Sequence, residues 1–377
     1  MSGLVQSQFR RGQIDALRVL AVGFVLFDHY AMPEGSGPVG RLSVRLFLII
    51  SGYLITEILL RVRHEAEKAG SGLGQPLIAF YLRRLLRIAP AYMLVVGLTY
   101  ALRPADFQGN ALLWHASFQS SIIFALHDSW DLPWRLSHLW TLSVQEQFYL
   151  LWPLVVLFVP RRRLLALTLS LMLIDPVFRL TMAALGQQET VAAFTLLPAS
   201  VSAIGVGAIA ALLEQRSAVP KAFAAPDPPK WLAVGLCAFI LACLIPHDFR
   251  WDYLALEYVW LAPLTGLLLS ASQGMRGPLG RLLDQAWLQY LGRISLGIYL
   301  YQWLAYDAVA AFFSAGDPLI GRSLVRFVLV TPVCIAFAAL SWTLLEQPVS
   351  RLRRLVPGTR RPRRTTIATA RSQLISH

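Results

Sequence analysis

Cysteine and charged residues are both scarce in this chain of 377 residues, in which 56% of residues are hydrophobic and only 15% are charged. So little charge excludes an ordinary soluble domain. The three cysteines, Cys237, Cys243 and Cys334, lie in apolar segments and lack the spacing of metal ligands. We therefore interpret them as small core residues and expect no metal site.

Acidic residues are fewer than basic ones, 21 against 34, which leaves a formal net charge of +13. The basic residues form short clusters between apolar runs, a distribution typical of membrane topology. We therefore expect a lipid bilayer around the chain and no nucleic-acid partner. A small-residue cleavage site is also lacking after the first apolar run, so we expect this run to remain as a signal anchor.

Apolar runs of about twenty residues recur along the chain and predict an all-α, polytopic membrane bundle of about ten transmembrane helices. We place these helices at 14–31, 44–60, 85–102, 144–160, 164–184, 191–212, 231–246, 254–272, 288–312 and 324–345. Loops rich in Lys and Arg alternate with loops that hold few, so both termini are predicted to be cytoplasmic, as in a multi-pass protein of the inner membrane. Residues 1–350 then form a transmembrane domain and residues 351–377 a basic, disordered tail.

The first apolar run, IDALRVLAVGFVLFDHY at 14–30, carries Arg18 and His29 within it. At 100° per residue, a separation of eleven places both side chains on nearly the same helical face, about 16 Å apart along the axis. Ionisable groups inside a bilayer normally face a bundle interior or a wet cavity. The alternative is that Arg18 reaches the membrane surface and pairs with Asp15, while His29 is a satisfied residue at the outer end.

Two further polar sets lie at the ends of predicted spans. Arg83, Arg84 and Arg87 share one face at the cytoplasmic end of the third span, where they either anchor the helix or bind a phosphorylated cytosolic ligand. Glu146 lies near the outer start of the fourth span. It either caps that helix with Ser143, in an S-x-x-E capping box, or acts at a site.

The predicted outer loop 103–143 is dense in aromatic and histidine side chains. Such residues form an interfacial belt or stack against sugar rings, and both interpretations stay open. They are Trp114, His115, Trp130, Trp134, His138 and Trp140.

Six stretches, in this order, together resemble the motifs of the membrane-bound acyltransferase 3 family. They are IDALRVLAVGFVLFDHY, RLFLIISGYLIT, RRLLRIAPAYML, LWTLSVQEQFYLLWPL, LGRISLGIYLYQW and LLEQP, spread over residues 10 to 350. The resemblance implies an O-acyltransferase with about ten membrane helices in residues 1–350. It also implies acyl-CoA, acetyl-CoA above all, as the cytosolic donor. The implied acceptor is a hydroxyl of an extracytoplasmic or lipid-linked carbohydrate, such as exopolysaccharide or O-antigen, with polysaccharide-assembly proteins as partners.

The resemblance also implies roles for individual residues, because several positions match the family motifs. Those residues are Arg18 and His29 on the first helix, Ser51 and Gly52 on the second, Arg84 and Arg87 with Arg83 beside them, and Glu146. The sequence departs from the family pattern at Gln145, Arg45 and Gln302, which stand where Glu, Asp and His are common. The last departure puts a direct role of the ninth helix in proton transfer in doubt.

Acyl transfer to a hydroxyl needs a base for the hydroxyl proton and a donor for the developing oxyanion. We expect His29 to be the base or a transient acyl carrier, and Glu146 to orient His29 or the acceptor. Arg84 and Arg87, with Arg83 or Arg18, are expected to hold the CoA phosphates. A conduit should connect this cationic mouth to His29. The alternatives are a transporter or flippase of lipid-linked sugars, or a membrane anchor without enzymatic activity.

Overall fold

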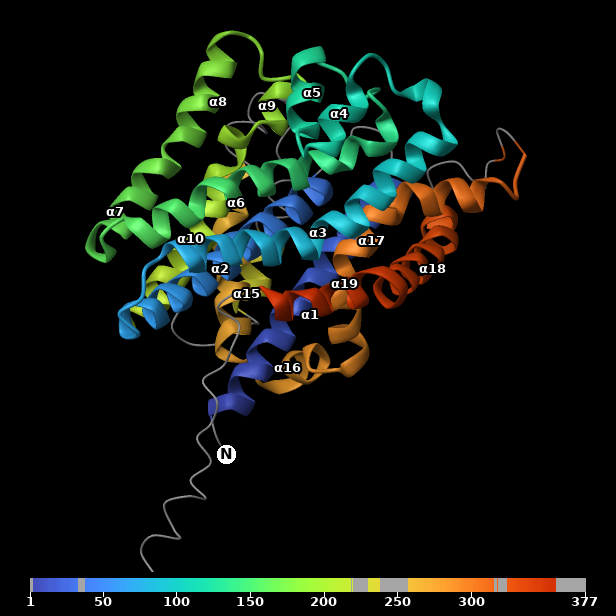
Figure 1. Ribbon diagram of the computed structural model, residues 1–377. Helices are drawn as coiled ribbons and strands as arrows, with labels where there is room; N and C mark the ends of the chain where they lie inside the picture. The colour runs from blue at the N-terminus through green and yellow to red at the C-terminus, as the bar shows by residue number, and fades with distance from the viewer. Residues whose placement is uncertain are drawn as a thin grey trace, which may run out of the picture.

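The structure is a computed structural model that describes residues 3–32, 38–217, 219, 230–237, 257–314, 317 and 324–356. Within these ranges the regular elements are helices, and no strand occurs (Figure 1). This agrees with the all-α class predicted from the apolar runs.

The long helices correspond to most of the predicted spans. Their bounds are Gly3–Ala31 for α1, Pro38–Lys68 for α2, Gly74–Leu102 for α3, Trp140–Phe158 for α6, Arg161–Met172 for α7, Ile174–Ala184 for α8, Val201–Gln215 for α10, Leu261–Gln273 for α15, Ala286–Ala310 for α17 and Leu324–Ser341 for α18. The shorter ones are Ala111–Ala116 for α4, Ser120–His127 for α5, Val191–Thr195 for α9, Glu257–Val259 for α14, Gly277–Leu283 for α16 and Gln347–Arg351 for α19.

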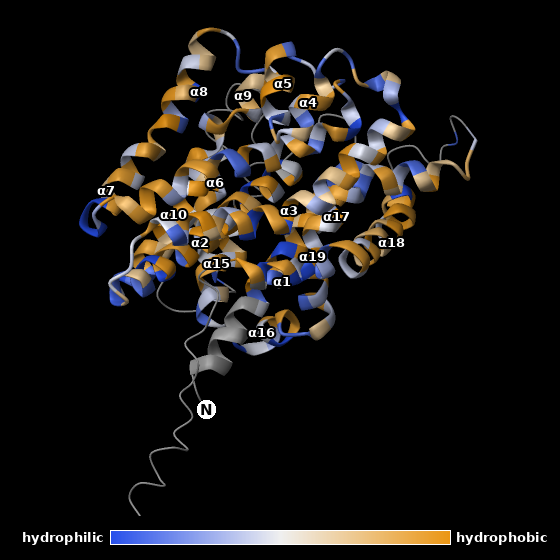
Figure 2. Cartoon of the chain, in the orientation of Figure 1, coloured by the Kyte–Doolittle hydropathy of each residue, from blue (hydrophilic) through white to orange (hydrophobic). Residues whose placement is uncertain are grey.

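Five helical stretches are long and apolar enough to cross a membrane: Val39–Lys68, Gly74–Leu102, Arg161–Ala184, Leu197–Gln215 and Leu324–Arg351. Their outward surfaces are apolar, as the orange faces of α3, α7, α8 and α18 in Figure 2 show. Exposed leucines on these faces suit a hydrocarbon environment; they include Leu98 on α3, Leu180 on α8 and Leu340 on α18. The chain is therefore a multi-pass membrane protein, while the number of ten spans and the orientation of the termini stay predictions.

Two predicted spans are interrupted in the structure. The span at 164–184 divides at Leu173 into α7 and α8, just before Pro176, which lacks the backbone donor of a continuous helix. The span at 191–212 divides into α9, a 3₁₀ turn at Leu197–Ser200 and α10. Most of the span predicted at 231–246 lies outside the described residues, as do Cys243 and the tail from residue 357 onward.

Helix α1 lies at the centre of the bundle and separates two hydrophobic clusters. Ala16, Leu17 and Ala21 pack toward α2, α10 and α15. Val22 and Leu26, further along the helix, pack toward α3, α17 and α18. Leu20 and Phe24 of the same helix are exposed, so protein encloses α1 only in part.

Glycines allow α2 and α10 to approach each other closely. A Cβ atom at Gly52 would lie 2.0 Å from the backbone oxygen of Ile204, and one at Gly207 would lie 2.0 Å from that of Ile49. Small residues at a membrane helix interface bring two backbones together in this way. Gly52 belongs to the Ser-Gly pair singled out in the sequence, and its neighbour Ser51 is thereby held on the face of α2 that points to the interior.

The loop predicted at 103–143 is a compact helical cap formed by α4, α5 and a 3₁₀ helix at Trp134–Leu139 (Figure 1). An ion pair joins this cap to α17: Arg135 donates to both carboxylate oxygens of Asp307, at 2.7 and 3.1 Å. The Trp134 ring packs edge-on against Trp303 of α17, with centroids 4.6 Å apart. Whether the aromatic residues of this loop contact sugars stays a prediction.

Candidate functional site

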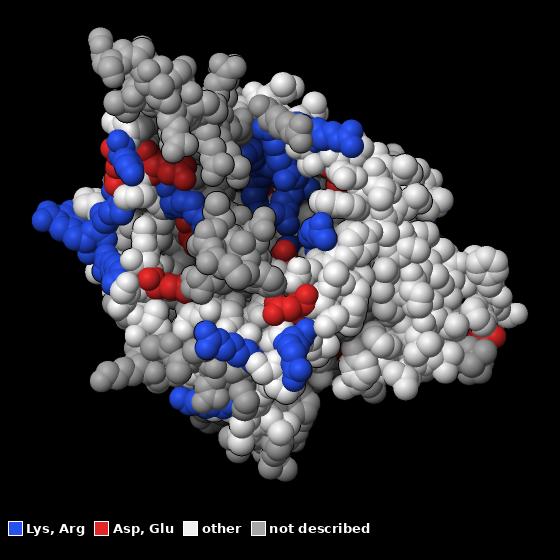
Figure 3. Space-filling view, turned by 90° about the horizontal axis from the view of Figure 1, so that it is seen from below, with Lys and Arg blue, Asp and Glu red and all other residues white. Residues whose placement is uncertain are grey.

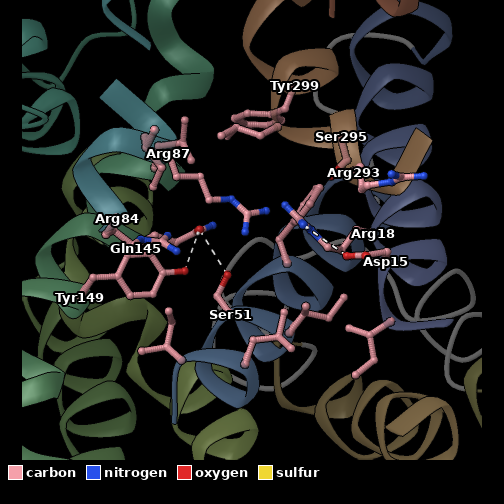
Figure 4. Close-up of a pocket in the computed structure, with 18 of the residues that line it drawn as sticks. Asp15, Arg18, Ser51, Arg84, Arg87, Gln145, Tyr149, Arg293, Ser295 and Tyr299 are labelled. Carbon is pink, nitrogen blue, oxygen red and sulfur yellow. Dashed lines mark hydrogen bonds and ion pairs between the residues drawn. The ribbon is translucent and has the colours of Figure 1, made fainter. Parts of the chain in front are cut away.

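A cavity of about 360 Å³ lies between α1, α2, α3, α6 and α17. Figure 3 shows a hollow in the lower face of the molecule that is lined by basic side chains, and Figure 4 shows the interior of the cavity. We call it the basic cavity. Its polar lining consists of Asp15, Arg18, Ser51, Glu57, Arg84, Arg87, Thr141, Gln145, Tyr149, Arg293, Ser295, Tyr299 and Arg353.

Positive charge predominates in the basic cavity. Five arginines line it, against two carboxylates, Asp15 and Glu57. Both carboxylates have arginine partners on their own helices: Asp15 lies 3.6 Å from Arg18, and Glu57 pairs with Arg61. Arg18 therefore pairs with Asp15, as in one of the two alternatives, and also lines the cavity, as in the other. Such an arrangement favours an anionic ligand.

Arg87 lies among the other cations of the cavity. The charged groups that act on it are Arg18, Arg84 and Arg353, with Asp15 as the acidic neighbour. The Arg87 side chain is exposed and extends into the cavity toward Arg18 (Figure 4). Several guanidinium groups held together in a recess repel one another. A bound anion relieves this repulsion, and the planar forks of arginine match phosphate oxygens.

Glu146 lies in the interior beside Arg84, whose Nη2 is 3.3 Å from its carboxylate. The Arg84 guanidinium also stacks on Tyr149, 3.4 Å from the ring centroid. Glu146 therefore holds Arg84 in place, and the predicted capping box is wrong. Helix α6 begins at Trp140, one turn before Ser143, so neither member of the box is at the helix end.

A short hydrogen-bond network crosses the cavity from α2 to α6. Ser51 Oγ donates to Gln145 Oε1 at 3.2 Å, and the Tyr149 hydroxyl donates to the same oxygen at 3.3 Å (Figure 4). Gln145 stands where the family often has Glu, so this network replaces a charged group with a neutral acceptor. The positive potential of the cavity is correspondingly less neutralised.

Tyr299 and Thr141 lie at the inner end of the cavity. Their hydroxyls are 2.6 Å apart, and the Tyr299 hydroxyl also donates to the backbone oxygen of His138. Ser295, one turn before Tyr299 on α17, is buried and its hydroxyl has no partner among the described residues. A buried hydroxyl of this kind is normally satisfied by water or a ligand.

His29 lies beyond this end of the cavity and does not line it. Its Nδ1 is 2.7 Å from Gln302 Oε1, and its ring stacks on Trp303 with centroids 5.5 Å apart. It faces the bundle interior as predicted, but the predicted open conduit from the cationic mouth to His29 is not present in the described structure. Val22, Leu26 and Ile298 pack together in one buried hydrophobic cluster.

The structure therefore brings together Arg18, Arg84 and Arg87 but places the other expected residues elsewhere. Arg83, adjacent to Arg84, does not line the cavity. Glu146 accepts a hydrogen bond from Arg84. Among the described residues, Glu146 makes no contact with His29 that would orient the imidazole. The Gln302 side chain contacts Nδ1 of the His29 ring.

Two cavity arginines were not identified from the sequence, Arg293 and Arg353. Arg293 lies within the stretch LGRISLGIYLYQW, for which no ligand-binding role was expected, and Arg353 lies in the segment expected to be a basic tail. Both are separated from Arg87 by about two hundred residues or more, so periodicity could not place them together.

His138 and His115 are buried histidines of the helical cap. Burial lowers the pKa of His138 to about 3 and that of His115 to about 4. His115 is held by the Ser120 hydroxyl at 2.8 Å and the backbone oxygen of Leu132 at 2.6 Å. Both imidazoles are therefore neutral at pH 7, and His115 is a structural residue of the cap.

A helical membrane bundle with a cavity lined by five arginines defines a membrane protein whose interior favours an anionic ligand. The sequence model of the acyltransferase domain family matches residues 11–346, nearly the whole bundle. The chain therefore belongs to the acyltransferase 3 family, which confirms the resemblance of the six motifs and the class of enzyme, an acyltransferase.

The chain is also similar to curated proteins. It is 39% identical over 158 residues to a peptidoglycan O-acetyltransferase, OatA, of Listeria monocytogenes, covering 38% of this chain and 24% of that protein. It is 33% identical over 162 residues to the O-acetyltransferase OatA of Staphylococcus aureus, covering 40% of this chain and 25% of that protein. It is 26% identical over 362 residues to the putative peptidoglycan O-acetyltransferase YrhL of Bacillus subtilis, covering 89% of this chain and 54% of that protein.

The chain thus spans between a quarter and about half of the length of these relatives. No solved structure matches the chain significantly.

Proposed function

We propose that this protein transfers an acetyl group from cytosolic acetyl-CoA to a carbohydrate hydroxyl on the far side of the membrane. The observation that carries the proposal is the basic cavity, in which Arg87 extends among Arg18, Arg84 and Arg353. A coenzyme A molecule carries several phosphate charges at one end and its thioester at the other. Its phosphate end therefore suits a recess that is lined by arginines.

The donor is proposed to bind with its phosphates against these arginines and its acyl arm directed toward Ser295 and Tyr299. The unpartnered Ser295 hydroxyl is available to the polar groups of the arm. The face of Figure 3 that contains the hollow is then cytoplasmic, in keeping with the positive-inside rule. We propose the cytoplasmic (inner) membrane as the location of the protein.

His29 is proposed to act as the general base. Its ring nitrogen removes the proton of the acceptor hydroxyl while the hydroxyl oxygen attacks the thioester carbonyl. The new C–O bond forms, the C–S bond breaks, and the departing thiolate receives the proton from the imidazole. The hydroxyl must contact His29 while it attacks the thioester. The thioester must therefore reach His29 as well.

We propose that the hydrogen-bonded pair of Tyr299 and Thr141, both of which line the cavity, separates it from His29. Tyr299 and Gln302 are three residues apart on α17, a rise of about 4.5 Å. We propose that a rearrangement of this hydroxyl pair admits the acyl arm. A barrier that opens only during the reaction also prevents hydrolysis of the thioester by water from the opposite face.

The acceptor that the comparisons favour is peptidoglycan, because two of the relatives are named peptidoglycan O-acetyltransferases. Exopolysaccharide and O-antigen, expected from the sequence, are the other carbohydrates to test, together with polysaccharide-assembly proteins as partners.

The decisive experiment follows radiolabelled acetyl from acetyl-CoA into peptidoglycan and surface polysaccharide of cells that express the protein. Label is expected in carbohydrate with the native protein and at background levels with His29→Ala. His127→Ala is the matched control, because His127 is an exposed histidine at the end of α5 and should leave labelling unchanged. Carbohydrate that crosses the membrane without gaining label would identify a flippase and refute the proposal.

A further inference from the structure

We infer that Gln302 is a positioning residue that selects the tautomer of His29, with the proton on Nδ1 and the lone pair on Nε2. This inference rests on the proposed role of His29 as the base. It assigns a specific task to a position where the sequence departs from the family pattern.

The orientation of the Gln302 amide follows from its surroundings. Gln302 is completely buried, and its Nε2 donates to the backbone oxygen of Tyr299 at 3.0 Å. A backbone carbonyl can only accept a hydrogen bond, so the amide nitrogen must face Tyr299. With the amide reversed, two oxygen atoms would face each other. The amide oxygen is therefore the atom directed at His29.

This orientation determines which nitrogen of His29 carries the proton. Gln302 Oε1 lies 2.7 Å from His29 Nδ1 and can only accept, so Nδ1 must be the N–H donor. In a neutral imidazole the other nitrogen then carries the lone pair. Nε2 is therefore the nitrogen that can remove a proton from a hydroxyl. In the opposite tautomer, Nε2–H would be a donor and could not act as the base.

The surrounding contacts hold both partners in register. The Tyr30 hydroxyl, next to His29, donates to the backbone oxygen of Gln302 at 2.6 Å. Arg326 of α18 donates to the backbone oxygens of His29 and Tyr30 at 2.9 and 3.0 Å. These bonds fix the end of α1 against α17, and the stacked ring of Trp303 limits rotation of the imidazole. Gln302 then acts on a ring that has little freedom to change its hydrogen-bond partner.

The first test measures the tautomer directly in the purified native protein. Nitrogen-15 NMR of histidine-labelled protein in lipid bilayers distinguishes protonated from unprotonated ring nitrogens. The His29 signals are identified by their loss in His29→Gln. We expect Nδ1 to be protonated and Nε2 unprotonated at a pH where the ring is neutral. The opposite tautomer in the native protein would overturn the inference.

The second test measures catalysis in Gln302 variants. Gln302→Leu removes the acceptor and should lower kcat by about tenfold or more, since a positioned base contributes at least that much. The KM for acetyl-CoA should be unchanged, because the donor is held at the arginines. Gln302→His should restore most of the activity, because imidazole also supplies one donor and one acceptor. Gln285→Leu, at an exposed glutamine at the start of α17, is the control.

The outcomes separate this inference from the proposed function. An active Gln302→Leu variant together with an inactive His29→Ala variant would overturn the role of Gln302 and retain His29 as the base. An active His29→Ala variant would overturn the base, while the NMR result would still decide the tautomer.

Discussion

Substitution of Arg87 by glutamine tests the basic cavity most directly. Arg87 extends into the cavity, and its charged neighbours are Arg18, Arg84 and Arg353, with Asp15 as the acidic group. Glutamine keeps a polar side chain of similar reach but removes the charge. The change therefore weakens the binding of an anion and relieves the repulsion among the remaining arginines, so affinity and stability should move in opposite directions.

The expected change in affinity follows from the strength of a charge-assisted hydrogen bond. Loss of one such bond to phosphate reduces binding by about 1.5–3 kcal/mol. Since 1.4 kcal/mol corresponds to a factor of about ten, the KM for acetyl-CoA should rise by about 10- to 100-fold. The repulsion that is relieved should raise the free energy of unfolding by less than about 1 kcal/mol, because the side chain is exposed to water and screened.

Steady-state transfer from acetyl-CoA by the purified protein gives kcat and KM, and thermal unfolding in detergent gives stability. An effect on KM alone is expected, since the phosphates are distant from the reacting carbonyl and bind equally in the ground and transition states. The KM of the native protein should also rise with ionic strength, and this dependence should be weaker in the variant.

Arg83→Gln is the matched comparison, because Arg83 is on the same helix and belongs to the same sequence motif but does not line the cavity. It should change the KM by less than about twofold, as for a surface charge. An unchanged KM in Arg87→Gln, or equal effects of the two substitutions, would refute the proposed location of the donor phosphates.

Three other substitutions concern the fold. Gly52→Ala should lower the free energy of unfolding by about 1–3 kcal/mol or more, because the new Cβ meets a backbone oxygen of α10 at 2.0 Å; Gly23→Ala, with nothing near it, is the control. Asp175→Asn should cost about 3–5 kcal/mol, because it removes the negative charge that faces the buried Arg179 guanidinium at 2.5 Å. Burial lowers the pKa of His115 to about 4, so the folded state loses stability as pH falls from about 6.5 toward 4. The loss should reach about 2 kcal/mol at pH 5, and His115→Gln should reduce it.

Thermal unfolding of the purified protein in detergent is the measurement for all three. Equal midpoints for the Gly52 and Gly23 variants would contradict the close approach of α2 and α10. An Asp175→Asn variant as stable as the native protein would show that Arg179 finds another partner or water. For His115, an unaltered difference between the midpoints at pH 7.5 and pH 5 would assign the pH dependence to other groups.

Most of the local structure could be predicted from the sequence. Periodicity and apolar length predicted the helices at 14–31, 44–60, 85–102 and 288–312, which the structure contains with somewhat longer or shifted ends. The helices α2 and α3 continue beyond the apolar runs because Lys, Arg and Glu also favour helix where it projects from the membrane. The breaks at Leu173 and Leu196 were missed, because an apolar run does not reveal where a helix bends.

The chemistry of the site was only partly predictable. Spacing placed Arg84 and Arg87 on one face of α3, and the structure retains this arrangement. Spacing could not show that Glu146 would pair with Arg84, a residue 62 positions away, or that Gln302 would bind His29 across 273 positions.

The sequence by itself determined the membrane helices, the clustered cations and membership of the acyltransferase 3 family, because these depend on the hydrophobicity, charge and order of neighbouring residues. The tertiary structure alone decided which of those groups meet. Contacts between distant helices depend on how side chains fill the space between them, so only the packed bundle assembles five arginines in one cavity and pairs His29 with Gln302.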